Sequence, residues 1–354
     1  MTEKRVSLKS NIIFVSAIAV FCTLLWGSAF PCIKIGYNLF HISGSDTPSV
    51  LIFAGARFSL AGIIVFIIGL FLNAKSMIPK KRDLLPVSAL AFFQTFLQYL
   101  LLYTGLVTVS GTKSSIFTSV AAFGSVILSA IVFRSDRFTA KKALGCLIGI
   151  SGVVIMNLSG DLGGFMFPGD LLVILSNLSG AAGNVISKKI STGRSPYFIS
   201  AWQLIIGGSA LIICGLAFGG KLVFYDIGCV LILLYLAAMA GVAFMLWTML
   251  LFHNDVSRVA VFNLLIPVFG TMWSGIFLHE NIFTLTNFIS LLLVCGGILL
   301  VNITIKRKTK ETMNQELSVG SQELSVNSQI LAIFHFRPAK IYRNFPFSIF
   351  HFQF

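Results

Sequence analysis

The chain has 354 residues, of which 56% are hydrophobic and only 11% are charged, and its mean hydropathy is +0.91. A soluble globular domain is about 25% charged, so this composition excludes one and indicates that lipid is the solvent. The net charge of +14 does not indicate a nucleic-acid partner, because the basic residues are dispersed over short loops instead of one folded domain.

Ten apolar stretches follow one another along the chain, and most approach the roughly 20 residues that a helix needs to cross a hydrocarbon core of about 30 Å. Their continuous apolar runs predict helices and not the alternating strands of a transmembrane barrel. The predicted spans are residues 12–38, 49–72, 85–107, 111–133, 143–158, 170–187, 197–218, 228–252, 259–278 and 285–305. The sequence therefore predicts an all-α integral membrane protein with ten transmembrane helices.

Lys and Arg residues fall mostly on one side of this ten-span arrangement. That side holds the N-terminal residues 1–11 and the loops at residues 75–82, 134–142, 188–194, 258 and 306–310. The loops on the other side carry Lys221. Because basic loops stay in the cytoplasm, we expect both termini to be cytoplasmic, in a bacterial inner membrane.

The fourth and fifth spans recur as the ninth and tenth at a constant offset of 145 residues, without a gap. The identical pairs are Phe117 and Phe262, Ser129 and Ser274, Ile131 and Ile276, Phe138 and Phe283, Thr139 and Thr284, Leu147 and Leu292, Gly152 and Gly297, and Asn157 and Asn302. The second span repeats more faintly, with Arg57 and Gly62 aligned to Gln203 and Gly208. Halves of five helices enter the membrane from opposite sides, so we expect two inverted repeats, residues 12–158 and 168–305, with a site between them.

A set of motifs over residues 14–303 resembles EamA-type members of the drug/metabolite transporter superfamily. The set consists of Leu25-Trp26-Gly27-Ser28-Ala29-Phe30 with Lys34, Arg57, Pro267, Glu280 and Gly296-Gly297. The resemblance implies ten helices in two inverted five-helix repeats around a cavity that opens alternately to each face. The first half departs from the family pattern, because Ala122 and Ser135 stand at the usual proline and glutamate positions. We therefore expect the fourth helix to bend less than the ninth, where Pro267 is a candidate for bending or gating.

Polar and aromatic side chains within the spans are the candidates for lining this cavity, because polar side chains that face lipid cost free energy. They are Trp26, Lys34, Arg57, Gln94, Gln98, Tyr99, Tyr103, Asn184, Trp202, Gln203, Trp247 and Asn263. The tryptophans have an alternative role in packing or interface anchoring, and Gln94 and Gln98 have one in hydrogen bonding across helices. The cysteines and histidines show no metal-ligand spacing, so we expect no metal, no cofactor and no enzymatic activity.

Arg57 lies roughly 13 Å into its predicted helix, near the bilayer midplane, and no acidic residue accompanies it at that depth. Either its side chain extends toward the membrane interface, or its charge pairs with a solute carboxylate, a phosphate or a backbone carbonyl. Lys34 and Lys113 lie nearer to the ends of their spans, where such extension is easier. The absence of buried acids gives no support to proton coupling.

The sequence thus predicts a transporter that exports small organic metabolites, amino acids or related amphipathic compounds, by alternating access. Its partners are the small-molecule solute and the lipid bilayer, without nucleic acid. Two alternatives stay open: a carrier of anionic solutes that uses Arg57 and Lys34 as counter-charge, and a membrane receptor or assembly subunit that transports nothing. A monomer and a weak homodimer are equally compatible with the sequence. Residues 306–354 form a predicted cytoplasmic tail, either disordered or lying on the membrane surface.

Overall fold

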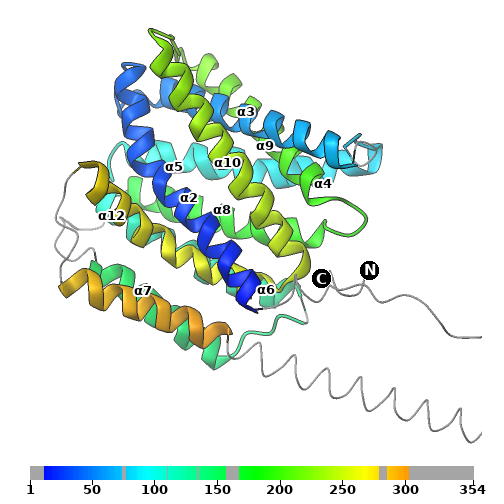
Figure 1. Ribbon diagram of the computed structural model, residues 1–354, viewed down its shortest axis with the longest axis vertical. Helices are drawn as coiled ribbons and strands as arrows, with labels where there is room; N and C mark the ends of the chain where they lie inside the picture. Colours follow the sequence, from blue (N-terminus) through cyan, green and yellow to red (C-terminus); the bar gives the residue numbers. More distant parts are fainter. Residues whose placement is uncertain are drawn as a thin grey trace, which may run out of the picture. The chain divides into compact units, whose positions relative to one another are not determined.

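The computed structural model of the protein describes residues 12–73, 77–109, 111–133, 135–156, 167–278 and 285–302. All regular structure in these ranges is helical, as the composition predicts (Figure 1). The elements are α2 (Ile12–Leu39), α3 (Thr47–Asn73), α4 (Lys81–Ala91), η2 (Phe92–Leu97), α5 (Gln98–Leu106), α6 (Gly111–Val132), α7 (Ala140–Met156), α8 (Gly169–Lys189), α9 (Pro196–Ala217), α10 (Ile227–His253), α11 (Val256–Ala260), η3 (Val261–Leu264), α12 (Leu265–Leu278) and an unlabelled 285–302 helix (Leu285–Asn302). The predictions for residues 1–11, Glu280 and residues 306–354 fall outside the described residues.

Helix is present in each of the ranges that the sequence predicts to span a membrane. α4, η2 and α5 form one continuous helical series, and α11, η3 and α12 form another. Among the described residues, seven helices are long and apolar enough to cross a membrane, and shorter apolar helices cover Phe117–Val132 and Val256–Gly270. The described part of the chain is therefore an all-α membrane fold.

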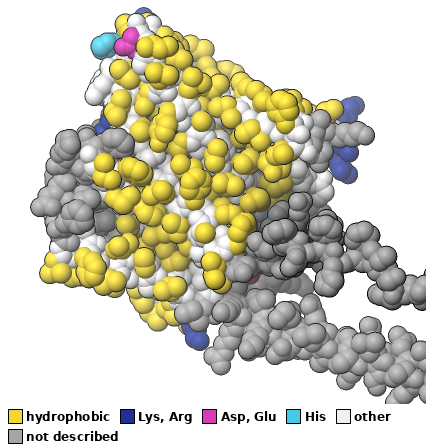
Figure 2. Space-filling model, in the orientation of Figure 1, with side chains coloured by type: hydrophobic (Ala, Val, Ile, Leu, Met, Phe, Trp, Pro, Cys, Tyr) yellow, Lys and Arg dark blue, Asp and Glu magenta, His cyan; other side chains and the backbone are white. Residues whose placement is uncertain are grey.

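The outer surface of the helices is suited to lipid. Hydrophobic side chains cover most of the face shown in Figure 2, and Lys and Arg lie near its margins. Large apolar side chains are strongly exposed, among them Phe71 at 87%, Leu85 at 80% and Ile131 at 75%. Apolar surface left in water costs about 25 cal/mol per Å², and soluble monomers rarely expose patches of this extent. This surface is stable only where hydrocarbon covers it.

Local capping explains where two of the long helices begin. The side chain of Ser195 accepts a hydrogen bond from the backbone N–H of Phe198 at 3.1 Å, with Pro196 as the first residue of α9. Asp226 accepts one from the backbone N–H of Cys229 at 3.0 Å, at the start of α10. These side chains satisfy N–H groups that have no partner within the helix, and proline is favoured at the first helical position because it lacks one.

α3 and α9 pack closely and antiparallel. A Cβ built on Gly55 would lie 2.6 Å from the carbonyl oxygen of Gly208, and one built on Gly62 would lie 2.8 Å from that of Ala201. Later residues of α3 thus meet earlier residues of α9. Small residues allow two helix backbones to approach this closely in a membrane, where packing replaces the hydrophobic driving force.

α7 and the 285–302 helix form a second close antiparallel pair. A Cβ on Gly145 would lie 2.8 Å from the carbonyl oxygen of Gly297, and a Cβ on Gly152 would lie 2.8 Å from that of Ser290. Gly145 and Ser290, like Gly152 and Gly297, are 145 residues apart, which is the offset of the sequence repeat. If each residue is replaced by its counterpart at this offset, the contact of Gly145 with Gly297 becomes the contact of Ser290 with Gly152. The two contacts are therefore related by the sequence repeat.

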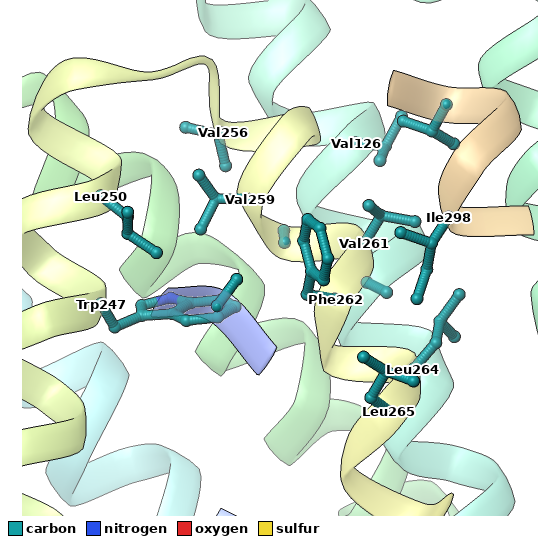
Figure 3. Packing of buried hydrophobic residues seen from close by; sticks show 14 of the residues in the cluster. Val126, Trp247, Leu250, Val256, Val259, Val261, Phe262, Leu264, Leu265 and Ile298 are labelled. Atoms are coloured by element: carbon teal, nitrogen blue, oxygen red, sulfur yellow. The ribbon is translucent and has the colours of Figure 1, made fainter. Parts of the chain in front are cut away.

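The remaining helices also show packing that is related between the two halves of the chain. α2 lies against α10 and α12, whereas α8 lies against α5 and α6. A hydrophobic cluster fills the space where α6, α10, α11, η3 and the 285–302 helix meet (Figure 3). Its buried members include Val126, Trp247, Val259, Phe262 and Ile298. Its member Trp247 also takes part in the hydrogen bonds of the candidate site.

Pro267 lies in α12, shortly after the 3₁₀ segment η3. Proline has no N–H, so it cannot donate to the carbonyl of Asn263 four residues earlier, and one hydrogen bond of the regular helical pattern is missing at this point. α6, the helix at the corresponding position of the first half, carries Ala122 and is a single α-helix over Gly111–Val132. Pro267 is thus a local irregularity of the ninth predicted span.

Candidate substrate-binding site

A buried network of amide and hydroxyl groups joins four helical segments. Asn184 of α8 accepts hydrogen bonds at its Oδ1 from Gln94 Nε2 at 3.2 Å and from Trp247 Nε1 at 3.1 Å. Its Nδ2 donates to Ser125 Oγ at 3.1 Å. Gln94, Ser125, Asn184 and Trp247 form the amide cluster, and all four are at least 95% buried. Such a network fixes its side chains because breaking any member leaves a buried polar group unpaired.

The amide cluster depends on a π-helical turn that the sequence does not predict. Gln94 lies in η2, where the hydroxyl of Ser179 donates to the carbonyl oxygen of Phe93 at 2.6 Å. Gly183 of α8 gives room to the Gln94 side chain, because a Cβ there would lie 2.5 Å from Gln94 Cβ. Single π-helical turns occur often at functional sites. Here the turn and the small residues of α8 place Gln94 against Asn184.

In the described part of the chain, hydrogen-bonding atoms without a partner lie both in the amide cluster and beside it. Gln94 Oε1 and Trp26 Nε1 are buried and have no hydrogen-bond partner among the described residues. The ring of Trp26 packs on Trp247 with centroids 5.0 Å apart. A solute beside these side chains would therefore meet one acceptor, one donor and the faces of two indoles.

A second cluster surrounds Arg57 of α3, which is 4% exposed. Its guanidinium carbon lies 4.3 Å from the ring centroid of Phe58 and 6.0 Å from that of Tyr99. One terminal nitrogen donates to the hydroxyl of Tyr103 at 3.5 Å, and Tyr37 lies within electrostatic range of the guanidinium. Arg57, Tyr37, Phe58, Tyr99 and Tyr103 are the arginine cluster. Its aromatic rings partly compensate the buried charge by cation–π attraction.

A chain of ring contacts links the two clusters. Beginning at Trp247, each ring packs on the next in the order Trp247, Trp26, Phe244, Phe58, Tyr99 and Tyr103, with centroid separations of 5.0, 5.5, 6.1, 4.4 and 6.0 Å. Most of these pairs are tilted or edge-on, the arrangements that aromatic rings prefer. The two polar clusters are therefore ends of one aromatic wall.

Other predicted residues lie near these clusters or apart from them. Gln98 lies against Gly180 of α8, and Gln203 is fully buried with no hydrogen-bond partner for its amide atoms among the described residues. Asn263 lies in η3, and its Oδ1 also has no hydrogen-bond partner among the described residues. In contrast, Lys34 is exposed on α2. The side chain of Lys113 is not among the described ones.

Trp202 lies apart from both clusters. Its indole N–H donates to the carbonyl oxygen of Met77 at 3.0 Å, and its ring packs on Phe66. These contacts join α9 to α3 and to the loop between α3 and α4. Both contacts are packing contacts, which is the alternative role that the sequence leaves open for this residue.

Sequence reasoning missed several members of the clusters. Ser125, Tyr37, Phe58 and Phe244 were not among the candidates, although they contact Asn184, Arg57 or Trp26 directly or electrostatically. Phe58 adjoins Arg57 in the sequence, which is a weak signal. A serine or phenylalanine in an apolar helix gives no sign of the face that it occupies, because the neighbouring helices decide that.

Two surface pockets lie elsewhere. One, of about 550 Å³, is lined by residues of α3, α5, α8 and α9 such as Leu51, Leu100 and Cys214. The other, of about 440 Å³, lies between α6 and the following loop, at Ile131 and Phe138. Neither is lined by a residue of the two clusters. In this structure the cluster side chains pack against one another.

Most of the described Lys and Arg residues gather at one end of the helices. This basic end carries Arg82, Arg137, Lys141, Lys142, Lys188, Lys189, Arg194 and Arg258. Contacts join its loops, since Arg194 pairs with Asp83 at 2.9 Å and Lys188 donates to the carbonyl oxygen of Phe252 at 3.1 Å. In the described residues, every Asp lies in a loop, at a cap or in a first helical turn. The middle of the described helices therefore holds the positive charge of Arg57 without a carboxylate.

The model of the EamA-like transporter family matches this chain twice, over residues 12–158 and 167–303. A Bacillus subtilis protein named "uncharacterized transporter YvbV" is 26% identical over 295 residues, which cover 82% of this chain and 92% of that protein. An Escherichia coli protein named "probable amino-acid metabolite efflux pump" is 27% identical over 293 residues, covering 79% of this chain and 92% of the relative.

A solved crystal structure has the same fold, with a TM-score of 0.69 at 16% sequence identity, covering 83% of this chain and 98% of the other. The family and the named relatives are transporters and not enzymes. Because the two family matches together span most of the sequence, this protein belongs to the EamA-like transporter family.

Proposed function

We propose that the chain crosses the membrane ten times, as two five-helix repeats inserted in opposite directions. The two consecutive family matches support the repeat. The antiparallel pairs α3–α9 and α7–(285–302) support the inversion, because each joins corresponding helices of the two halves. The other contacts agree, since exchanging α2 with α8, α12 with α6, and α10 with α5 reproduces the observed packing. Such repeats place a solute site where the halves meet.

The basic end is the cytoplasmic end in this proposal. Its loops carry most of the Lys and Arg residues of the described chain, and basic loops are retained in the cytoplasm. With ten spans, both termini then lie in the cytoplasm, and the membrane is the bacterial inner membrane. Lys221, between α9 and α10, lies at the opposite end.

The amide cluster is the central element of the proposed mechanism. Gln94 and Ser125 belong to the first half, whereas Asn184 and Trp247 belong to the second, and each hydrogen bond of Asn184 to Gln94 or Ser125 crosses the boundary. Movement of one half against the other exposes these groups to one face or the other, where a solute replaces the bonds between the halves. This is alternating access, with the polar groups exchanging partners instead of remaining unpaired.

The proposed solutes are small organic metabolites, amino acids or related amphipathic compounds, and the proposed direction is export. The amide cluster offers hydrogen-bond donors and acceptors, and the aromatic wall offers apolar surface, a combination typical of small-molecule sites. The relative named as an amino-acid metabolite efflux pump supports both the solute class and the direction. A carrier of anionic solutes remains the second candidate because Arg57 is a buried cation, while the exposed Lys34 gives that candidate no further support.

Counterflow in proteoliposomes tests the proposal. The full chain is reconstituted, and uptake of a pooled metabolite library is compared between wild type, Asn184→Ala, Trp26→Ala and the matched control Trp202→Phe. We expect both site variants to lose uptake of the same compound, whereas the control transports it as wild type does. Each protein must elute as a folded monodisperse species in detergent. Equal uptake in all four proteins contradicts the site, and no uptake by wild type contradicts the transport of these compounds.

A further inference from the structure

Arg57 presents more hydrogen-bond donors than its surroundings accept. The residue lies ten positions into α3, about 15 Å along the helix, and is 4% exposed. A guanidinium has five N–H donors and stays protonated in proteins. The contact to the Tyr103 hydroxyl uses one terminal nitrogen at 3.5 Å, the outer limit of a hydrogen bond, and Nε has no partner among the described residues.

The surroundings of Arg57 are aromatic and contain no carboxylate in the described part of the chain. Phe58 and Tyr99 cover the guanidinium, and the hydroxyl of Tyr103 lies beside it. The described Asp residues are in loops, caps or first helical turns. An arginine inside a membrane protein is costly, ordinarily pairs with an acid or with carbonyl groups, and often marks a solute pathway.

We propose that Arg57 is the subsite for a solute carboxylate, so that the transported compounds are amphipathic carboxylates with an apolar or aromatic body. The inference rests on the proposed transport function and specifies its substrate. Nε and a terminal nitrogen form a planar fork whose N–H groups donate to both oxygens of a carboxylate. The Tyr103 hydroxyl donates a further hydrogen bond to the same group. A flat carboxylate suits a site covered by flat rings better than a tetrahedral phosphate does.

The remainder of the solute lies along the aromatic wall in this proposal. Phe58, Phe244 and Trp26 connect Arg57 to the amide cluster, where Gln94 Oε1 has no partner among the described residues. That oxygen accepts a hydrogen bond from a donor at the far end of the solute, such as a hydroxyl or amide N–H group on its apolar body. Carboxylate, apolar body and donor are thus recognised by three successive parts of one wall.

Matched pairs of compounds test the subsite. The probes are L-phenylalanine, L-leucine and phenylacetate, each paired with its carboxamide, and phenyl phosphate serves as the tetrahedral anion. Binding to the full chain in lipid nanodiscs and counterflow in proteoliposomes are both measured. We expect wild type to prefer at least one acid over its amide by about tenfold or more, because one ion pair with two hydrogen bonds distinguishes them.

Variants then assign that preference to the guanidinium. We expect Arg57→Gln to remove the preference for the acid. Arg57→Lys retains the charge without the planar fork, so it should keep only part of the preference. The control Lys34→Gln should leave the preference unchanged. If Arg57→Gln does not fold, the acid-to-amide ratios of wild type and Arg57→Lys still decide. Transport of amides and acids alike, or preference for phenyl phosphate, overturns the subsite while transport stands. No flux of any compound in wild type overturns the proposed function as well.

Discussion

Asp136, in the loop between α6 and α7, accepts hydrogen bonds at the start of α11 from both the backbone N–H and the hydroxyl of Ser257, the former at 3.0 Å. Lys142 of α7 pairs with the same carboxylate. Asp136 is 2% exposed and Lys142 is 4% exposed. One buried carboxylate therefore fastens the fourth and fifth predicted spans to the beginning of the ninth, at the basic end.

Asp136→Ala is expected to destabilise the protein by about 3 kcal/mol or more, because it leaves the Lys142 charge buried without a partner. Ser257→Ala removes one hydroxyl contact and is expected to cost about 1 kcal/mol. Unfolding in detergent, followed by tryptophan fluorescence against denaturant, measures both. The control is Ser43→Ala, at an exposed position. Equal stability of Asp136→Ala and the control refutes a structural role of this contact.

Asp255 predicts a pH dependence of stability. Burial and the charge of Asp136 raise the pKa of Asp255, although Lys142, Lys188 and Arg258 oppose the shift. Burial also disfavours ionisation of Asp136, but hydrogen bonds from Lys142 and Ser257 outweigh it and lower the pKa of Asp136. The folded protein thus binds a proton at Asp255 more readily than the unfolded chain does, and at Asp136 less readily.

The two residues act in opposite directions as the pH falls. As the pH falls, Asp255 of the folded protein becomes protonated above the ordinary aspartate pKa of about 3.9, which removes a buried charge. Mild acidification at this residue therefore increases the free energy of unfolding. The contribution of Asp136 is present above the unfolded pKa and is lost as the pH falls through its lowered folded pKa. We expect the stability of wild type minus that of Asp255→Asn to increase from about pH 7 to about pH 4. A difference that stays constant or decreases contradicts the assignment.

The glycines between α3 and α9 make a packing prediction. A Cβ on Gly208 would lie 2.6 Å from the backbone nitrogen of Ser59 and 2.8 Å from the carbonyl oxygen of Gly55, so the backbones must separate to admit it. Gly208→Ala is expected to cost about 1–3 kcal/mol, measured by the same unfolding experiment. Gly44→Ala is the control, because no atom lies within 4 Å of its built Cβ. If the two substitutions have the same effect, α3 and α9 are not tightly packed.

The sequence predicts the helices well, but it identifies only some of the residues that meet in the candidate site. Apolar runs long enough for a membrane locate the helices regardless of their neighbours, and capping residues such as Ser195 and Asp226 sharpen their ends. Arg57, Gln94 and Asn184 could be selected because polar side chains are rare in such runs. Trp26 and Trp202 cannot be distinguished in this way, since both are tryptophans in apolar helices. Their different surroundings depend on the packing of helices distant in sequence.

The π-helical turn marks a second limit of sequence reasoning. Nothing in Phe92–Leu97 itself breaks an α-helix, and the turn accompanies a contact from Ser179, 86 residues away, to the carbonyl of Phe93. The orientation of Gln94 within the amide cluster depends on that turn. A helical wheel of the third predicted span groups Gln94 with Gln98, but it does not identify Asn184 and Ser125 as partners.

The position of the basic end can be checked by labelling. Thr192→Cys lies in the loop between α8 and α9 at the basic end, and Lys221→Cys lies between α9 and α10 at the other end; both positions are exposed. A membrane-impermeant maleimide applied to intact cells is expected to label Lys221→Cys and not Thr192→Cys, while both are labelled after lysis. Wild type measures the background from the native cysteines. The reverse pattern places the basic end outside the cytoplasm.

Two tryptophans that make equivalent hydrogen bonds separate stability from transport. Trp247 Nε1 donates to Asn184 Oδ1 at 3.1 Å within the amide cluster, and Trp202 Nε1 donates to the Met77 carbonyl oxygen at 3.0 Å apart from it. Replacing either by Phe removes one indole N–H and is expected to cost about 1 kcal/mol of stability. Only Trp247→Phe removes a hydrogen bond that Asn184 Oδ1 accepts. We therefore expect only this variant to reduce counterflow, by about tenfold if the proposed solute binding depends on the amide cluster. Similar stability loss with unequal transport assigns the amide cluster to the solute pathway. Equal transport in the two variants limits Trp247 to a role in folding, because its hydrogen bond would then matter no more than that of Trp202.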